Sequence, residues 1–139
     1  MKRVFLDTNI LIDYIDNRTG ADNAELIFAC GFSGEIKLFA SSLTFANMAY
    51  IIKGRTKEEK YNALALMADI VEILPLGKIE VMSAIAQPVK DFEDMLQYQC
   101  AKTANCDYIV TNDRRHYEFS DITHYSSAEF VAQIDSLTK

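Results

Sequence analysis

The feature that most constrains this chain is a regular alternation of short apolar segments with segments of helical periodicity. The apolar segments predicted to be strands are residues 3–7, 36–40, 70–74 and 107–111, with a weaker one at 122–125. The predicted helices are residues 8–16, 21–32, 43–53, 57–69, 78–86, 92–105 and 127–137. The first four strands begin about every 33 to 37 residues, which is the length of a strand–helix–strand unit. The alternation therefore predicts a three-layer α/β/α fold, with helices on both faces of a parallel sheet of about five strands.

Length and composition restrict the class of protein further. The chain has 139 residues, the size of one domain, and half of them are apolar. Polar residues interrupt the first apolar stretch, so it is predicted to be neither a signal peptide nor a membrane span. The three cysteines are expected to be reduced thiols in a cytoplasmic protein. A net charge of −6 argues against tight non-specific binding to nucleic acid, but it is compatible with a nuclease whose acidic residues gather at a metal.

Carboxylates stand where the predicted strands end and where one helix begins. Asp7 ends the first strand, Asp113 follows the fourth, and Asp91 and Asp94 open the helix at 92–105. In a parallel sheet the carboxyl ends of strands and the amino ends of the helices between them lie at one edge, so these side chains are expected to converge. Converging carboxylates repel one another unless a cation lies among them. The pattern therefore favours a divalent metal site and a metal-dependent hydrolase.

Each carboxylate also has a purely structural interpretation. Asp7 and Asp91 are suitable N-caps, Asp94 is favoured in the first turn of a helix by the helix dipole, and Asp113 is an ordinary turn residue. Glu93 points toward a neighbouring helix face and ranks below Asp91 and Asp94 as a site residue. The metal interpretation is preferred because all four aspartates are expected at one end of one sheet.

Three motifs give the chain a resemblance to a known family. The motifs are Leu6-Asp7-Thr8-Asn9, Asp91-Phe92-Glu93-Asp94-Met95-Leu96-Gln97-Tyr98 and Asp107-Tyr108-Ile109-Val110-Thr111-Asn112-Asp113. In order and spacing the chain resembles PIN-domain proteins, the fold of the VapC-type toxin ribonucleases, from residue 3 to about residue 131. The resemblance implies a single PIN domain over residues 1–139 with strand order 3-2-1-4-5. It also implies hydrolysis of RNA with Mg²⁺ or Mn²⁺, an antitoxin protein as partner, and a homodimer.

The resemblance also implies roles for individual residues. Asp7, Asp94 and Asp113 are expected to be catalytic metal ligands. Asp91 is expected to be either a fourth carboxylate ligand or an outer-shell residue that contacts the ligands and not the metal. The family usually carries a Glu in the helix after the second strand, where this chain has Asn47. An amide supplies no charge, so weaker metal binding is expected, with Asn47 orienting a water on the metal. A catalytically weak or inactive PIN module that binds RNA or a protein is therefore the alternative function.

Basic and histidine side chains near the last motif are less specific. Arg114 and Arg115 follow Asp113 directly and are expected to bind the scissile phosphate, although a solvated turn explains them equally well. Loop or surface roles are expected for His116 and His124. A small-molecule phosphohydrolase, which would need no basic surface around the cleft, is a third interpretation.

Overall fold

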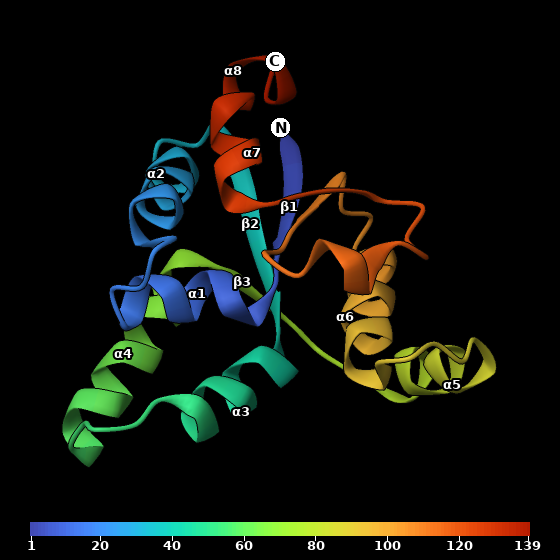
Figure 1. The fold of residues 1–139 in the computed structure, drawn as a ribbon, viewed down its shortest axis with the longest axis horizontal. Helices are drawn as coiled ribbons and strands as arrows, with labels where there is room; N and C mark the ends of the chain where they lie inside the picture. The colour runs from blue at the N-terminus through green and yellow to red at the C-terminus, as the bar shows by residue number, and fades with distance from the viewer.

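The computed structural model describes residues 1–139 and contains one five-stranded parallel sheet in the order β3-β2-β1-β4-β5 (Figure 1). The strands are β1 Lys2–Leu6, β2 Ile36–Ser41, β3 Glu72–Leu74, β4 Tyr108–Val110 and β5 Thr123–Tyr125. In the register, Val4 of β1 is paired with Leu38 of β2 on one side and with Tyr108 of β4 on the other. The predicted fold class and strand order are confirmed. The residues that follow β1 and β4 are consequently neighbours at the carboxyl edge of the sheet.

Helices cover both faces of this sheet. They are α1 Thr8–Ile15, α2 Ala21–Phe32, α3 Ser42–Ile51, α4 Lys57–Ile70, α5 Lys78–Ala86, α6 Phe92–Thr103, α7 Ser127–Ala132 and α8 Ile134–Leu137, with a short 3-10 helix, η1, at Arg114–Tyr117. Figure 1 shows α1 and α2 on one side of β1, and α5 and α6 on the other. Because successive side chains of a strand point to opposite faces, β1 contributes Val4 and Leu6 to one apolar core and Phe5 to the other. Both faces of β1 are thus buried, which fixes its carboxyl end rigidly.

Two predicted boundaries are wrong in an informative way. The strand predicted at 70–74 is shorter, because α4 continues through Ile70 and only Glu72–Leu74 pairs with β2. The helix predicted at 127–137 is two helices, because the backbone at Gln133 leaves the helical conformation. In both cases an apolar periodicity continues across the break, so the sequence pattern contains no signal for it.

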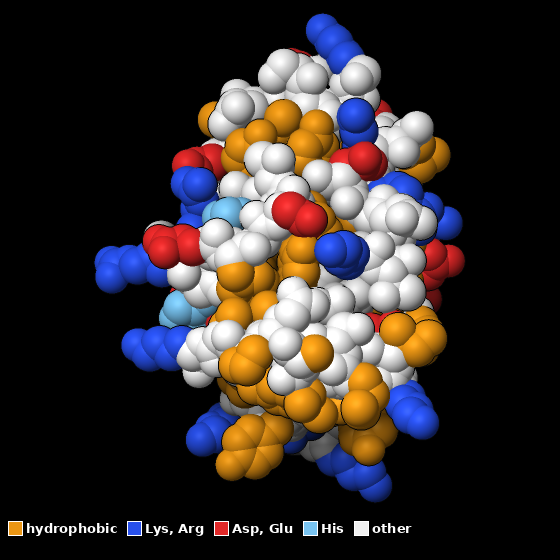
Figure 2. All heavy atoms as spheres, turned by 90° about the vertical axis from the view of Figure 1, so that its right-hand side faces the viewer, with side chains coloured by type: hydrophobic (Ala, Val, Ile, Leu, Met, Phe, Trp, Pro, Cys, Tyr) orange, Lys and Arg blue, Asp and Glu red, His pale blue; other side chains and the backbone are white.

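One helix exposes an apolar face. Ile79, Met82 and Ile85 follow one another at helical spacing on α5, and each is more than half exposed. Figure 2, which views the right-hand side of Figure 1, shows hydrophobic side chains gathered over the lower part of this face, where α5 lies. None of the helices combines the length and the apolar character needed to cross a membrane.

Candidate metal centre

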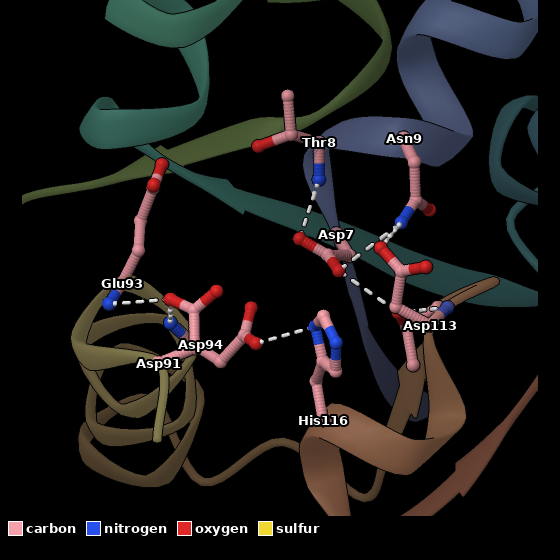
Figure 3. Close-up of polar contacts among 9 residues, drawn as sticks. Asp7, Thr8, Asn9, Asp91, Glu93, Asp94, Asp113 and His116 are labelled. Atoms are coloured by element: carbon pink, nitrogen blue, oxygen red, sulfur yellow. Dashed lines mark hydrogen bonds and ion pairs between the residues drawn. The ribbon is translucent and has the colours of Figure 1, made fainter. Parts of the chain in front are cut away.

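A cleft of about 270 Å³ opens at the carboxyl edge of the sheet. Its lining residues are Asp7, Thr8, Asn9, Ile12, Arg18, Asn47, Ile51, Asp91, Glu93, Asp94, Gln97, Asp113 and His116. The four aspartates predicted from the sequence and Asn47 are therefore all brought together. Figure 3 shows the carboxylates converging from the end of β1, from the start of α6 and from the segment after β4. The two predicted arginines lie beside this cleft, along a second depression that begins at Asp113.

Asp7 is the most buried carboxylate of the cleft, with 6% of its surface exposed. Its Oδ1 accepts a hydrogen bond from the backbone N–H of Thr8 at 2.8 Å and caps α1, and its Oδ2 accepts one from Thr111 Oγ1 at 2.8 Å. Burial raises the pKa of Asp7 to about 6, with smaller contributions from the charges of Asp113 and Glu93, while the two hydrogen bonds act in the opposite direction. The Asp7 side chain thus both caps α1 and contributes a carboxylate to the cleft.

Asn9 lies between two of the carboxylates. Its Nδ2 donates to Asp113 Oδ2 at 3.1 Å and to Asp7 Oδ2 at 3.4 Å (Figure 3). Asp113 is further oriented by its backbone N–H, which donates to Thr111 Oγ1 at 3.0 Å. A single amide group thus bridges the carboxylates that follow β1 and β4, and it holds them close together in spite of their repulsion.

Asp94 is the carboxylate with the most perturbed ionisation. Burial, the largest cause, and the charges of Asp7 and Asp91 together raise the pKa of Asp94 to about 7, while His116 acts in the opposite direction. Asp91 caps α6, because its Oδ1 accepts hydrogen bonds from the backbone N–H groups of Glu93 and Asp94 at 3.0 and 3.3 Å. A loop or surface role was expected for His116, but its Nδ1 lies 2.9 Å from Asp94 Oδ2 inside the cleft.

Glu93, which ranked below Asp91 and Asp94 in the sequence analysis, also lines the cleft. The side-chain amide of Asn47 on α3 donates a hydrogen bond to the carboxylate of Glu93 on α6. The sequence pattern of α6 alone gave no signal for this contact, because it depends on how closely α3 approaches. Asn47, where the resemblance leads one to expect a glutamate, consequently holds a glutamate from another helix.

Buried hydroxyl groups connect the helices around the cleft. Thr8 Oγ1 of α1 and Thr44 Oγ1 of α3 are hydrogen-bonded at 2.9 Å, and Gln97 Nε2 of α6 donates to Thr44 Oγ1 at 2.8 Å. Ser41, the N-cap of α3, donates its hydroxyl to the Gln97 carbonyl oxygen. These hydrogen bonds join the middle of α6 to the first turns of α1 and α3, so the carboxylates around them have little freedom to move apart.

The basic side chains near the cleft differ in whether they already form an ion pair with a carboxylate of the protein. Arg114 donates from Nη1 to both carboxylate oxygens of Glu129, at 3.0 and 2.8 Å. Arg115 is exposed, forms no ion pair and lies beside Asp91 and His116 at the edge of the cleft. Arg18, which belongs to none of the sequence motifs, is the one lysine or arginine that lines the cleft itself. It follows α1 in a connection without any motif, so only the fold reveals it.

The residues of the cleft fit a divalent cation. The donor atoms are predominantly carboxylate oxygens, which hard cations prefer. Asp94 Oδ2 is buried and has no hydrogen-bond donor. The buried Asp7 and the partly buried Asp94 have raised pKa values that a bound cation would bring down again.

Together, the fold and the site define a parallel α/β protein with an acidic cleft at the carboxyl edge of its sheet. The family model for the PIN domain matches residues 3–115, and the chain belongs to the PIN-domain family. It is 30% identical over 146 residues to Ribonuclease VapC1 of Aquifex aeolicus (strain VF5), a comparison that covers 98% of each chain.

Solved structures share this fold at lower sequence identity. VapBC2 from Rickettsia felis, bound to a DNA fragment from their promoter, is 17% identical with a TM-score of 0.72, covering 89% of this chain and 98% of that one. VapBC-1 from nontypeable Haemophilus influenzae is 19% identical with a TM-score of 0.62, covering 91% of this chain and 98% of the other.

Proposed function

We propose that this protein is a metal-dependent ribonuclease that hydrolyses phosphodiester bonds of RNA. The observation that carries the proposal is the cluster of Asp7, Asp94 and Asp113 at the edge of one sheet, in which the buried Asp7 and the partly buried Asp94 have raised pKa values. Holding carboxylates in this way costs free energy unless a cation compensates their charge. The 30% identity to a ribonuclease supports RNA as the substrate.

The metal is Mg²⁺ or Mn²⁺, held by Asp7, Asp94 and Asp113, with Asp91 beside them. When bound, such an ion lowers the pKa of water and neutralises charge on the phosphate under attack. Glu93 supplies the negative charge that Asn47 lacks, and Asn47 orients Glu93 through its amide. The Asn47 carbonyl oxygen accepts no hydrogen bond from the protein, which leaves it available to orient a water.

Arginines at the edge of the cleft bind the RNA backbone in this proposal. Arg115 and Arg18 are the better candidates, because a phosphate would not have to displace a bidentate partner to reach them. Arg114 contributes more weakly, since it is already paired with Glu129. A few local cations on a protein of net charge −6 predict RNA binding that weakens steeply with salt.

The alternative to a ribonuclease is a catalytically weak or inactive PIN module that binds RNA or a protein partner. Asn47 and the acidic net charge favour this alternative. Cleavage of RNA by the purified protein should be measured with Mg²⁺, with Mn²⁺ and with EDTA. We expect metal-dependent cleavage that Asp7→Asn abolishes and that Asp69→Asn, an exposed acidic control on α4, leaves unchanged. RNA binding without cleavage in any metal would instead support the alternative.

An antitoxin protein is proposed as a partner, supported by the likeness to the VapBC structures.

A homodimer is proposed as well, supported by the exposed apolar face of α5 at Ile79, Met82 and Ile85. Action in the cytoplasm is consistent with the three free thiols. Light scattering on the wild type and on Met82→Glu tests the dimer, because a charge in the middle of a buried apolar interface should produce monomers.

A further inference from the structure

We propose that His116 is a nitrogen ligand of the candidate metal centre, and that it makes the centre prefer a first-row transition-metal dication such as Co²⁺ over Mg²⁺. The inference rests on the proposed metal centre and adds to it a ligand and a metal preference. His116 lies on η1, three residues after Asp113, and its side chain is 47% exposed, so a metal ion can reach it from solvent.

The contact between His116 and Asp94 is close but is not a hydrogen bond. Nδ1 of His116 lies 2.9 Å from Oδ2 of Asp94 (Figure 3). Asp94 Oδ2 nevertheless has no hydrogen-bond donor, although the atom is buried. A ring N–H that served only to neutralise Asp94 would be expected to point at this oxygen. The arrangement places a ring nitrogen and a carboxylate oxygen side by side, as two ligands of one cation are placed.

The spacing of these atoms agrees with that of metal ligands. Neighbouring ligands of an octahedral ion at 2.0–2.1 Å are about 3 Å apart, close to the separation of the Asp94 and His116 atoms. One oxygen of Asp91 completes a set in which the ligand atoms of the three residues lie within 4.8 Å of one another. Two ligands at about 2.1 Å from one ion are at most about 4.2 Å apart, so a small movement of the side chains brings Asp91, Asp94 and His116 around a common point.

An imidazole ligand changes which metal the site prefers. Mg²⁺ binds oxygen ligands almost exclusively, whereas imidazole nitrogen binds Fe²⁺, Co²⁺, Ni²⁺ and Zn²⁺ well. Asp7 and Asp113 would supply the same oxygen atoms to either class of ion, so the difference depends on His116. The metal preference can therefore be tested at this one residue.

Binding of Co²⁺ and of Mg²⁺ should be measured by titration calorimetry on the wild type, His116→Ala and His116→Asp, without RNA. We expect His116→Ala to weaken Co²⁺ much more than Mg²⁺, changing the ratio of the two dissociation constants by about tenfold or more. His116→Asp should recover Mg²⁺ binding but not the preference for Co²⁺, because it supplies oxygen in place of nitrogen. The visible absorption of bound Co²⁺ should differ between the wild type and both variants. His124→Asn, at the other histidine, is the matched control and should behave as the wild type.

An unchanged ratio in His116→Ala would overturn the inference, and so would a Co²⁺ preference that survives in His116→Asp. In either case His116 would only neutralise Asp94. A wild type that binds neither ion would overturn both the inference and the metal-dependent function. A wild type that binds Co²⁺ with the expected response to His116→Ala, but cleaves no RNA in any metal, would support the ligand assignment and refute the proposed function.

Discussion

Replacement of Asp7 by Asn should make the metal-free protein more stable. Burial is the largest cause of the shift that raises the pKa of Asp7 from 3.8 to about 6, which corresponds to about 3 kcal/mol against the charged form at neutral pH. Asparagine removes this charge and keeps the shape, and its carbonyl oxygen can still accept the Thr8 N–H bond. The bond from Thr111 must be rearranged, at a cost of about 1 kcal/mol. We therefore expect a net gain of about 1 to 3 kcal/mol for Asp7→Asn.

The pH dependence of this gain has a defined sign. The folded pKa of Asp7 lies above the unfolded value, so folded protein binds more protons than unfolded protein between about pH 4 and pH 6. Asp7 consequently lowers the free energy of unfolding of the wild type as the pH rises through this window, and the loss is complete above it. Asp7→Asn lacks this contribution. The stability difference should be small near pH 4 and reach its full size at about pH 7.

Thermal and urea unfolding, followed by circular dichroism in EDTA and in Mg²⁺, measure this effect. In EDTA at pH 7.5 the variant should melt several degrees higher, since 1 kcal/mol corresponds to roughly 4 °C for a chain of this size. Metal at one hundred times its dissociation constant stabilises a protein that binds it by about 2.7 kcal/mol, so most or all of the variant's advantage should be lost in Mg²⁺. The reasoning would be refuted if Asp7→Asn were no more stable than the wild type in EDTA, or if the gap did not close at low pH. Asp69→Asn is the control for loss of an exposed carboxylate.

Further predictions concern the residues around the carboxylates. Glu93→Asn should weaken metal binding, as calorimetry would reveal. The double variant Asn47→Glu/Glu93→Asn, which exchanges the two side chains, should restore most of the lost metal affinity. If the double variant does not restore it, Glu93 does more than supply a charge. Asn47→Glu alone should lower metal-free stability, because it places a second carboxylate against Glu93. Arg115→Ala should weaken RNA binding and reduce its salt slope by about 1, as fluorescence anisotropy would show. Arg114→Ala should have the smaller effect on RNA because Glu129 already pairs with this arginine, and equal effects would contradict the assignment.

The central strand and the residues that follow it could be predicted from the sequence for a physical reason. A strand buried on both faces consists almost entirely of apolar residues, so the first polar residue after Val4, Phe5 and Leu6 marks its end. The same argument applies to Ile109 and Val110 before the segment that carries Asp113. Because parallel strands all expose the same end at one edge, convergence of the carboxylates follows from topology, without any knowledge of side-chain contacts.

The residues that the sequence did not reveal owe their place to contacts between elements far apart in the chain. Glu93 was ranked low from its position on α6 alone, but Asn47 of α3 meets it there. His116 appeared to be an isolated histidine until the fold placed η1 against the start of α6. Arg18 lies in a connection whose path depends on how α1 and α2 pack. Periodicity describes one element at a time, so it contains no information on any of these three contacts.

The structural and functional interpretations of the acidic residues proved to be compatible, and the reason is that a carboxylate has two oxygens. Asp91 caps α6 with Oδ1, and its second oxygen accepts no hydrogen bond from the protein. Asp7 caps α1 with one oxygen and presents the other to Thr111 and Asn9 at the bottom of the cleft. A helix cap contributes about 1 kcal/mol, which offsets part of the repulsion among the crowded charges. Capping also fixes the orientation of each carboxylate in the absence of metal. The cluster can therefore persist in the empty protein, and the binding energy of a cation need not be used to assemble it.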